Sequence, residues 1–275
     1  MTLEKENKLK RLLSVGSNVQ VSLAIYDLAS GYQILAHPDV LFHPASTIKI
    51  GVMMEVFHQT ALGVFSLDDP LEIKNAFTSI ADQSEFSLVP AEDSESDLYR
   101  QIGKSISLRE LTRQMIVTSS NLATNLLIEK VGAENVTHFM RELGTNDLII
   151  QRGVEDHKAY GLGLNNSATA RSLMQVLVRL AKRSVVSPEA SDEMISILQQ
   201  QRFNEGIPAY LPDSVRVAHK NGWDKKLYHD AAIVYPPQHT PYIVVIMTSG
   251  LSATKAAPTL VAALSQEIYR QLIGL

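Results

Sequence analysis

Ser46 and Lys49 lie three residues apart at the start of an apolar stretch. On a helix, this spacing places both side chains on one face about one turn apart, so that a hydroxyl and an amine lie together. The residues that follow would bury this helix, because they are mostly apolar: Ile48, Val52, Met53, Val56 and Phe57. A serine beside a buried lysine has the chemistry of a nucleophile and its base. The pattern also arises by chance, so other segments must support it.

Two other segments carry polar residues where chemistry is possible. Ser119-Ser120-Asn121 stands between two predicted helices, where a serine could instead cap the second helix. His219-Lys220-Asn221-Gly222-Trp223 lies in a predicted strand, where the lysine could simply be solvated. A glycine inside a strand, however, often marks the close approach of a backbone or ligand.

Composition excludes several classes of function. The chain has 275 residues and a net charge of −4, which argues against nucleic acid and anionic membranes as partners. It has no cysteine, so it contains no disulfide, thiol nucleophile or Cys-ligated zinc. The first residues lack the apolar core of an export signal, which predicts either a cytoplasmic protein or a trimmed form of an exported one. No stretch is long enough to span a membrane, and we expect a monomer that binds a small molecule.

Periodicity predicts a helix–strand–helix–strand–helix order. Helices are expected at residues 3–15, 46–59, 107–117, 121–131, 134–143, 167–183, 188–200 and 255–275, and strands at 19–28, 32–36, 214–223, 228–235 and 242–248. Between them, residues 151–166 read as a long functional loop. The acidic residues at positions 82–97 read as a solvated surface loop.

The simplest packing of these elements is an α/β (α+β) fold. Its five-stranded, mostly antiparallel sheet is flanked by the terminal helices and built from residues 1–45 and 201–275. Residues 46–200 would form an inserted all-α domain that carries the Ser46 helix and the loop 151–166. The active site would lie between the two domains.

Together, the three polar segments resemble the signature motifs of the penicillin-recognising serine enzymes. The match is closest to the class A β-lactamases, whose motifs are Ser-x-x-Lys, Ser-Asp-Asn and Lys-Thr-Gly. This chain has Ser46-Thr47-Ile48-Lys49, Ser119-Ser120-Asn121 and Lys220-Asn221-Gly222 in the same order. The resemblance covers roughly residues 20–270.

The resemblance implies a metal-free serine hydrolase without a cofactor, acting through an acyl-enzyme and foremost on β-lactams. Ser46 would attack the carbonyl, Lys49 would take its proton, and Ser119 would pass a proton to the leaving nitrogen. Backbone N–H groups of Ser46 and Trp223 would form the oxyanion hole. The residues implied for substrate binding are Asn121, Lys220, Asn221, Gly222 and Trp223.

The chain departs from the family pattern at three places. Ser120 replaces the aspartate of the second motif, and Asn221 replaces the hydroxyl residue of the third. The loop lacks the family's Glu-x-x-Leu-Asn segment; Glu155 is the best match for the carboxylate that hydrolyses the acyl-enzyme, and Asp156 is a second candidate. Without such a carboxylate the enzyme would acylate quickly and release slowly.

Three other functions fit the same residues. The acylation machinery could serve a D-Ala-D-Ala peptidase or an esterase, and the fold could serve a non-catalytic sensor of β-lactams or peptidoglycan. Several histidines and one aspartate near the motifs have no metal-ligand spacing, so we expect them to be structural or peripheral: His43, His157, His219, His229 and Asp230.

Overall fold

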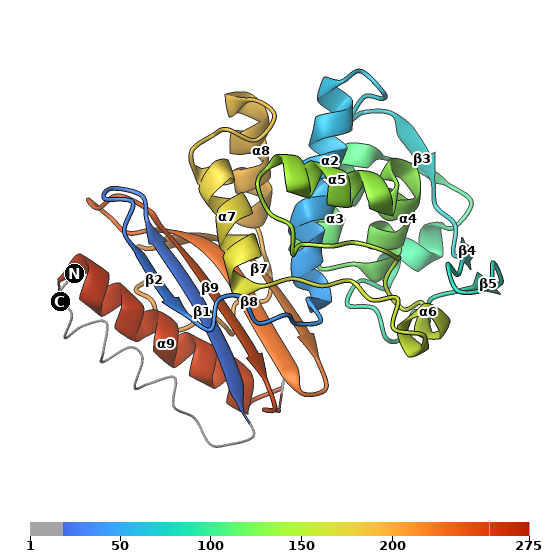
Figure 1. Ribbon diagram of the computed structural model, residues 1–275. Coiled ribbons are helices and arrows are strands. Elements are labelled where there is room, and N and C mark those ends of the chain that lie inside the picture. Colours follow the sequence, from blue (N-terminus) through green and yellow to red (C-terminus); the bar gives the residue numbers. More distant parts are fainter. Residues whose placement is uncertain (1–18, 253, 275) are drawn as a thin grey trace.

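The computed structural model describes residues 19–252 and 254–274. A five-stranded antiparallel sheet forms one half of the molecule, in the order β2-β1-β9-β8-β7 (Figure 1). Its strands are β1 (Gln20–Asp27), β2 (Gln33–Ala36), β7 (Arg216–Asp224), β8 (Leu227–Tyr235) and β9 (Tyr242–Ser249). Strands from the first and the last part of the described chain therefore share one sheet, which confirms the predicted fold class. The helix expected at residues 3–15 lies outside the described residues.

The two faces of the sheet pack against different layers. On β9, Val244 and Ile246 face helix α9 (Ala256–Ile273), whereas Ile243, Val245 and Met247 belong to the larger core under the other helices. This division follows from the alternation of side chains along a strand. In Figure 1, α9 covers one face and the helical part lies beyond the other. No helix in the described ranges has both the length and the apolar character to cross a bilayer.

Helix α2 (Lys49–Ala61) is the centre of the helical part. Every residue from Lys49 to Phe57 is buried, because the helix is apolar on most of its sides and neighbouring helices pack around it. These neighbours and the remaining helices are α3 (Leu108–Val117), α4 (Asn121–Val131), α5 (Ala133–Glu142), α6 (His157–Gly161), α7 (Ala170–Ala181) and α8 (Pro188–Leu198). Ser107 caps α3, since its side chain accepts a hydrogen bond from Glu110 N at 3.2 Å.

The part of the chain between α2 and α3 is not helical. It holds two small antiparallel ribbons, which pair β3 (Pro70–Glu72) with β6 (Ser105–Ser107) and β4 (Phe77–Thr78) with β5 (Glu85–Phe86), and a 3₁₀ turn η2 (Asp97–Gln101). The all-α composition expected for residues 46–200 is therefore wrong in this segment. Strands of two or three residues have no detectable periodicity. The division into domains at residues 45/46 and 200/201 stays a prediction.

Candidate active site

Ser46 lies on a 3₁₀ turn, η1 (Ala45–Ile48), that leads directly into α2. The sequence predicted one α-helix starting at this point; the first turn is tighter, as helix N-termini often are. The turn is fixed by Thr47, whose hydroxyl donates to Pro44 O at 2.6 Å. Ser46 is half-buried, while Lys49 at the start of α2 is fully buried.

Lys49 is held by the second motif. Its Nζ donates to Ser119 O at 2.6 Å, to Ser119 Oγ at 3.2 Å and to Asn121 Oδ1 at 2.9 Å. Burial lowers the pKa of Lys49 to about 7, although the charges of Asp93 and Glu155 oppose the shift. No hydrogen bond joins Lys49 Nζ to Ser46 Oγ in the described chain. Such contacts are often long in an unliganded enzyme.

The three residues of the second motif have separate tasks. Ser120 caps α4, because its Oγ accepts from Ala123 N at 3.1 Å, and it thus performs the capping role that the sequence left open. Ser119 has a φ of 58°, a conformation that non-glycine residues adopt at an energetic cost. This backbone turns both the carbonyl and the hydroxyl of Ser119 toward Lys49.

Gly222 on β7 lies against the Ser46 turn. A Cβ on Gly222 would stand 2.5 Å from Ser46 N and 3.0 Å from Thr47 N, so only glycine allows this contact. The contact brings the third motif next to the backbone nitrogen of Ser46. Trp223 follows on the strand, and its 41% exposed side chain lines the pocket.

Lys220 and Asn221 are buried and do not line the pocket. Lys220 Nζ donates to Asn221 O at 2.9 Å, and burial and then the charge of Lys49 lower the pKa of Lys220 well below its ordinary value. The Asn221 amide donates to Phe203 O and to the Tyr228 hydroxyl, both at 3.3 Å. The role of Asn221 in substrate binding therefore stays a prediction.

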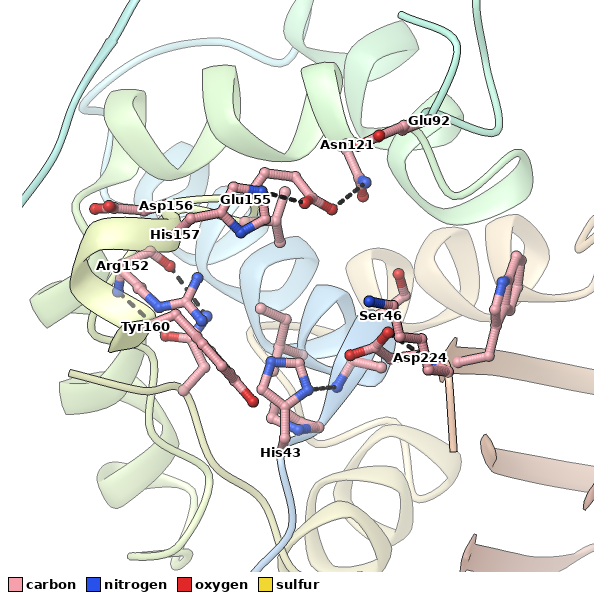
Figure 2. Close-up of a pocket in the computed structure, with 17 residues that line it drawn as sticks. His43, Ser46, Glu92, Asn121, Arg152, Glu155, Asp156, His157, Tyr160 and Asp224 are labelled. Atoms are coloured by element: carbon pink, nitrogen blue, oxygen red, sulfur yellow. Dashed lines mark hydrogen bonds and ion pairs between the residues drawn. The ribbon is translucent and has the colours of Figure 1, made fainter. Parts of the chain in front are cut away.

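Glu155 reaches the site from the loop that the sequence singled out. Its Oε1 accepts from Asn121 Nδ2 at 3.3 Å, and its Oε2 lies 3.5 Å from His157 Nε2. Asn121 thus connects Glu155 to Lys49. Glu155 has a φ of 61°, which directs its carboxylate into the pocket, whereas the side chain of Asp156 points away from it (Figure 2).

Asp156, the second candidate in the loop, has a structural task. Its carboxylate is buried and accepts from Ala159 N, Ser79 Oγ and Ile80 N at 2.8–3.1 Å. These bonds cap α6 and tie the loop to the neighbouring segment, so that both carboxylate oxygens already have partners. Glu155 is therefore the loop carboxylate that remains available.

Two supporting residues were not identified from the sequence. Asp93 accepts from Asn121 N and Leu122 N at 2.9–3.0 Å at the start of α4, and from the Tyr99 hydroxyl at 2.8 Å. It belongs to the acidic segment that was read as a solvated loop, and for this residue that interpretation is wrong. Asn125 on α4 holds the loop by pairing with both Val154 N and Val154 O, at 2.7 and 3.0 Å. No local pattern distinguishes either residue from its neighbours.

These segments enclose a pocket of about 700 Å³ (Figure 2). Ser46, Asn121 and Glu155 border it from three separate segments, together with the end of β7. The lining residues with titratable side chains are His43, Glu92, Arg152, Glu155, Asp156, His157, Tyr160, Asp224 and Lys225. Among the described residues, no group of His, Asp and Glu side chains could hold a metal ion.

Two of the four histidines near the motifs line the pocket, and the other two are buried. His43 and His157 are at the pocket wall, and Ala45 N donates to His43 Nδ1 at 3.2 Å. His229 is fully buried; its Nε2 donates to His43 O at 2.9 Å, and burial lowers its pKa to about 4. His219 is paired with Asp230 at 2.9 Å.

Comparisons with known proteins agree with this architecture. A sequence model of the β-lactamase enzyme family matches residues 4–272. A β-lactamase of Rhodobacter capsulatus is 25% identical over 238 residues, covering 85% of this chain and 76% of that protein. β-Lactamase Toho-2 of Escherichia coli is 26% identical over 242 residues, covering 85% and 77%.

Solved structures share the fold. The structure of PBP-A has a TM-score of 0.84 at 22% identity and covers 99% of this chain and 97% of its own. The β-lactamase of Sphaerobacter thermophilus DSM 20745 also has a TM-score of 0.84, at 21% identity, and covers 100% and 99%. The chain therefore belongs to the β-lactamase enzyme family and is a β-lactamase-like hydrolase.

Proposed function

We propose that this protein hydrolyses β-lactams through an acyl-enzyme on Ser46. The observation that carries the proposal is the position of Lys49: it is fully buried, its pKa is lowered to about 7, and it is one helical turn from Ser46. A lysine with this pKa is partly neutral at physiological pH and can accept the serine proton.

In the acylation step, Ser46 Oγ attacks the lactam carbonyl and its proton passes to Lys49. The C–N bond then breaks, and the ring nitrogen takes a proton that Lys49 passes through Ser119 Oγ, 3.2 Å from Nζ. The backbone N–H groups of Ser46 and Trp223 stabilise the oxyanion. This role is supported by the close approach of Gly222 to the Ser46 turn.

For deacylation we assign Glu155 as the base that takes a proton from water. The water attacks the ester carbonyl of acylated Ser46, the ester C–O bond breaks, and the leaving serine oxygen regains the proton that Glu155 took from the water. Two observations support this role. Glu155 borders the same pocket as Ser46, and its hydrogen bond to Asn121 fixes one carboxylate oxygen while leaving the other near His157.

The solved structures include a PBP-A mutant described as an acyl-enzyme complex with penicillin G, at 22% identity and a TM-score of 0.83. A penicillin is therefore a reasonable first acylating agent for this chain. D-Ala-D-Ala peptides and esters remain the alternative substrates of the same machinery.

Hydrolysis of a chromogenic cephalosporin tests the proposal. We expect turnover by the unaltered protein and none by Ser46→Ala, with both proteins giving the same circular dichroism spectrum. Equal turnover by the two proteins would exclude Ser46 as the nucleophile. Turnover of D-Ala-D-Ala peptides without turnover of the cephalosporin would favour the peptidase.

A further inference from the structure

His219 on β7 and Asp230 on β8 form a buried polar pair behind the pocket. Their side chains are 1% and 0% exposed, and the reaction steps above use neither. His219 Nδ1 lies 2.9 Å from Asp230 Oδ1, and His219 Nε2 lies 3.1 Å from Asn204 Oδ1. Both ring nitrogens therefore have an oxygen as neighbour.

The orientation of the Asn204 amide is fixed by its other contacts. Its Nδ2 donates to Gln201 O at 3.2 Å and to Arg202 O at 3.3 Å, so its oxygen must be the atom that faces His219. This oxygen can only accept, and His219 Nε2 therefore carries a proton.

Asp230 fixes the other side of the ring. Its Oδ2 accepts from Ile207 N at 2.9 Å, and a Cβ on Gly206 would stand 2.5 Å from the same oxygen. The backbone of this loop thus packs directly on the carboxylate. Asp230 Oδ1 and His219 Nδ1 then share one hydrogen bond at 2.9 Å, so both oxygens of this carboxyl group have a partner.

The pair is connected to the pocket wall through the residue that precedes Asn204. Phe203 packs edge-on against Trp223, with ring centroids 5.1 Å apart, and the amide of Asn221 donates to Phe203 O at 3.3 Å. Trp223 lines the pocket next to Gly222. Fixing Asn204 therefore fixes the segment that supports this wall.

We propose that His219 is a positioning residue of the active site. Through its hydrogen bonds to Asp230 and Asn204, it anchors Asn204 and, through Phe203, holds Trp223 at the pocket wall. The effect on turnover rests on the proposed β-lactam hydrolysis, while the hydrogen bond to Asn204 and the position of Trp223 are independent of it.

Side-chain nitrogen NMR of the full chain tests the hydrogen bond to Asn204. We expect a proton on Nε2 of His219, assigned by comparison with His219→Gln. An Nε2 without a proton in the unaltered protein would overturn the assignment.

The only tryptophan of the chain is Trp223, so its fluorescence reports on the wall directly. We expect Asn204→Ala to increase quenching by acrylamide. The variant should also raise KM for a cephalosporin by roughly three- to tenfold, the factor that one hydrogen bond contributes, with little change in kcat. Glu205→Ala, next to it on the same exposed loop, is the matched control.

Equal quenching in the two variants would overturn the positioning role. If the unaltered protein turns over no β-lactam, the proposed function fails, and NMR and fluorescence still decide the role of His219.

Discussion

Gly222 approaches Ser46 so closely that a Cβ on the glycine would stand 2.5 Å from the Ser46 nitrogen. This contact joins the sheet to the turn that carries the proposed nucleophile. Both backbone N–H groups of the proposed oxyanion hole depend on it, because Ser46 supplies one and Trp223, the residue after Gly222, supplies the other.

Gly222→Ala should therefore slow acylation while leaving the fold in place. The methyl group pushes β7 away from the Ser46 turn and misplaces the oxyanion donors, and losing one such donor typically costs about 10²–10³ in rate. The measurement is the rate of adduct formation with penicillin. Gly161→Ala on α6 is the control, because a Cβ there meets nothing within 4 Å. Equal rates for both variants would contradict the role of this contact.

The lowered pKa of Lys49 predicts how acylation depends on pH. Only the neutral amine can accept a proton, so the acylation rate should rise with pH through about 7 and then level off. Single-turnover kinetics over a series of pH values measure this profile. Lys49→Arg keeps a permanent charge and should be about 10²–10⁴ slower at every pH. A flat profile for the unaltered protein would exclude Lys49 as the base.

The charge of Asp93 should affect the pH dependence of the acylation rate. Its charge is the largest electrostatic influence that raises the pKa of Lys49, so Asp93→Asn should lower that pKa further and move the acid limb of the profile to lower pH. The variant should also lose about 1–2 kcal/mol of stability, since the carboxylate accepts from two N–H groups at the start of α4. Asp97→Asn removes an exposed charge nearby and should change neither quantity. An unshifted limb in Asp93→Asn would contradict this coupling.

His229 should contribute to acid unfolding. Burial lowers its pKa from 6.5 to about 4, so the unfolded chain takes up this proton at a higher pH than the folded protein does. The free energy of unfolding should thus fall as the pH decreases from about 6.5 to about 4, by about 3 kcal/mol from this residue.

Urea unfolding over this pH range measures the contribution of His229. His229→Gln removes the titrating ring but keeps a donor and an acceptor, so its stability should fall less steeply. Parallel curves for the variant and the unaltered protein would show that His229 does not contribute.

The fold and the three motifs could be predicted because their signals are local. The sheet strands alternate or are continuously apolar, and each motif is a short run of residues whose types are visible in the sequence. The roles of Asp93 and Phe203 depend on contacts with residues that are 20 or more positions away, such as Asp93 with Asn121 and Phe203 with Trp223. Such long-range contacts produce no periodic pattern in the sequence from which they could be predicted.

In the loop 151–166, too, the sequence could not predict which of two adjacent residues has the functional role. Glu155 and Asp156 were both candidates because each is a carboxylate at the right place in the chain. The φ of 61° at Glu155 turns one carboxylate toward Asn121, and the cap of α6 takes up the other. The backbone conformation therefore determines which of the two carboxylates is available in the pocket. The residue types alone do not indicate this conformation.

Intact-mass measurement at successive times after mixing with penicillin tests the central claim most directly. The account predicts that the unaltered protein returns to its original mass, that Glu155→Gln keeps one covalent adduct on Ser46, and that Ser46→Ala never gains one. An adduct on another residue, or none on Glu155→Gln, would contradict it. An adduct of equal lifetime in Glu155→Gln and the unaltered protein would show that Glu155 does not release the acyl group.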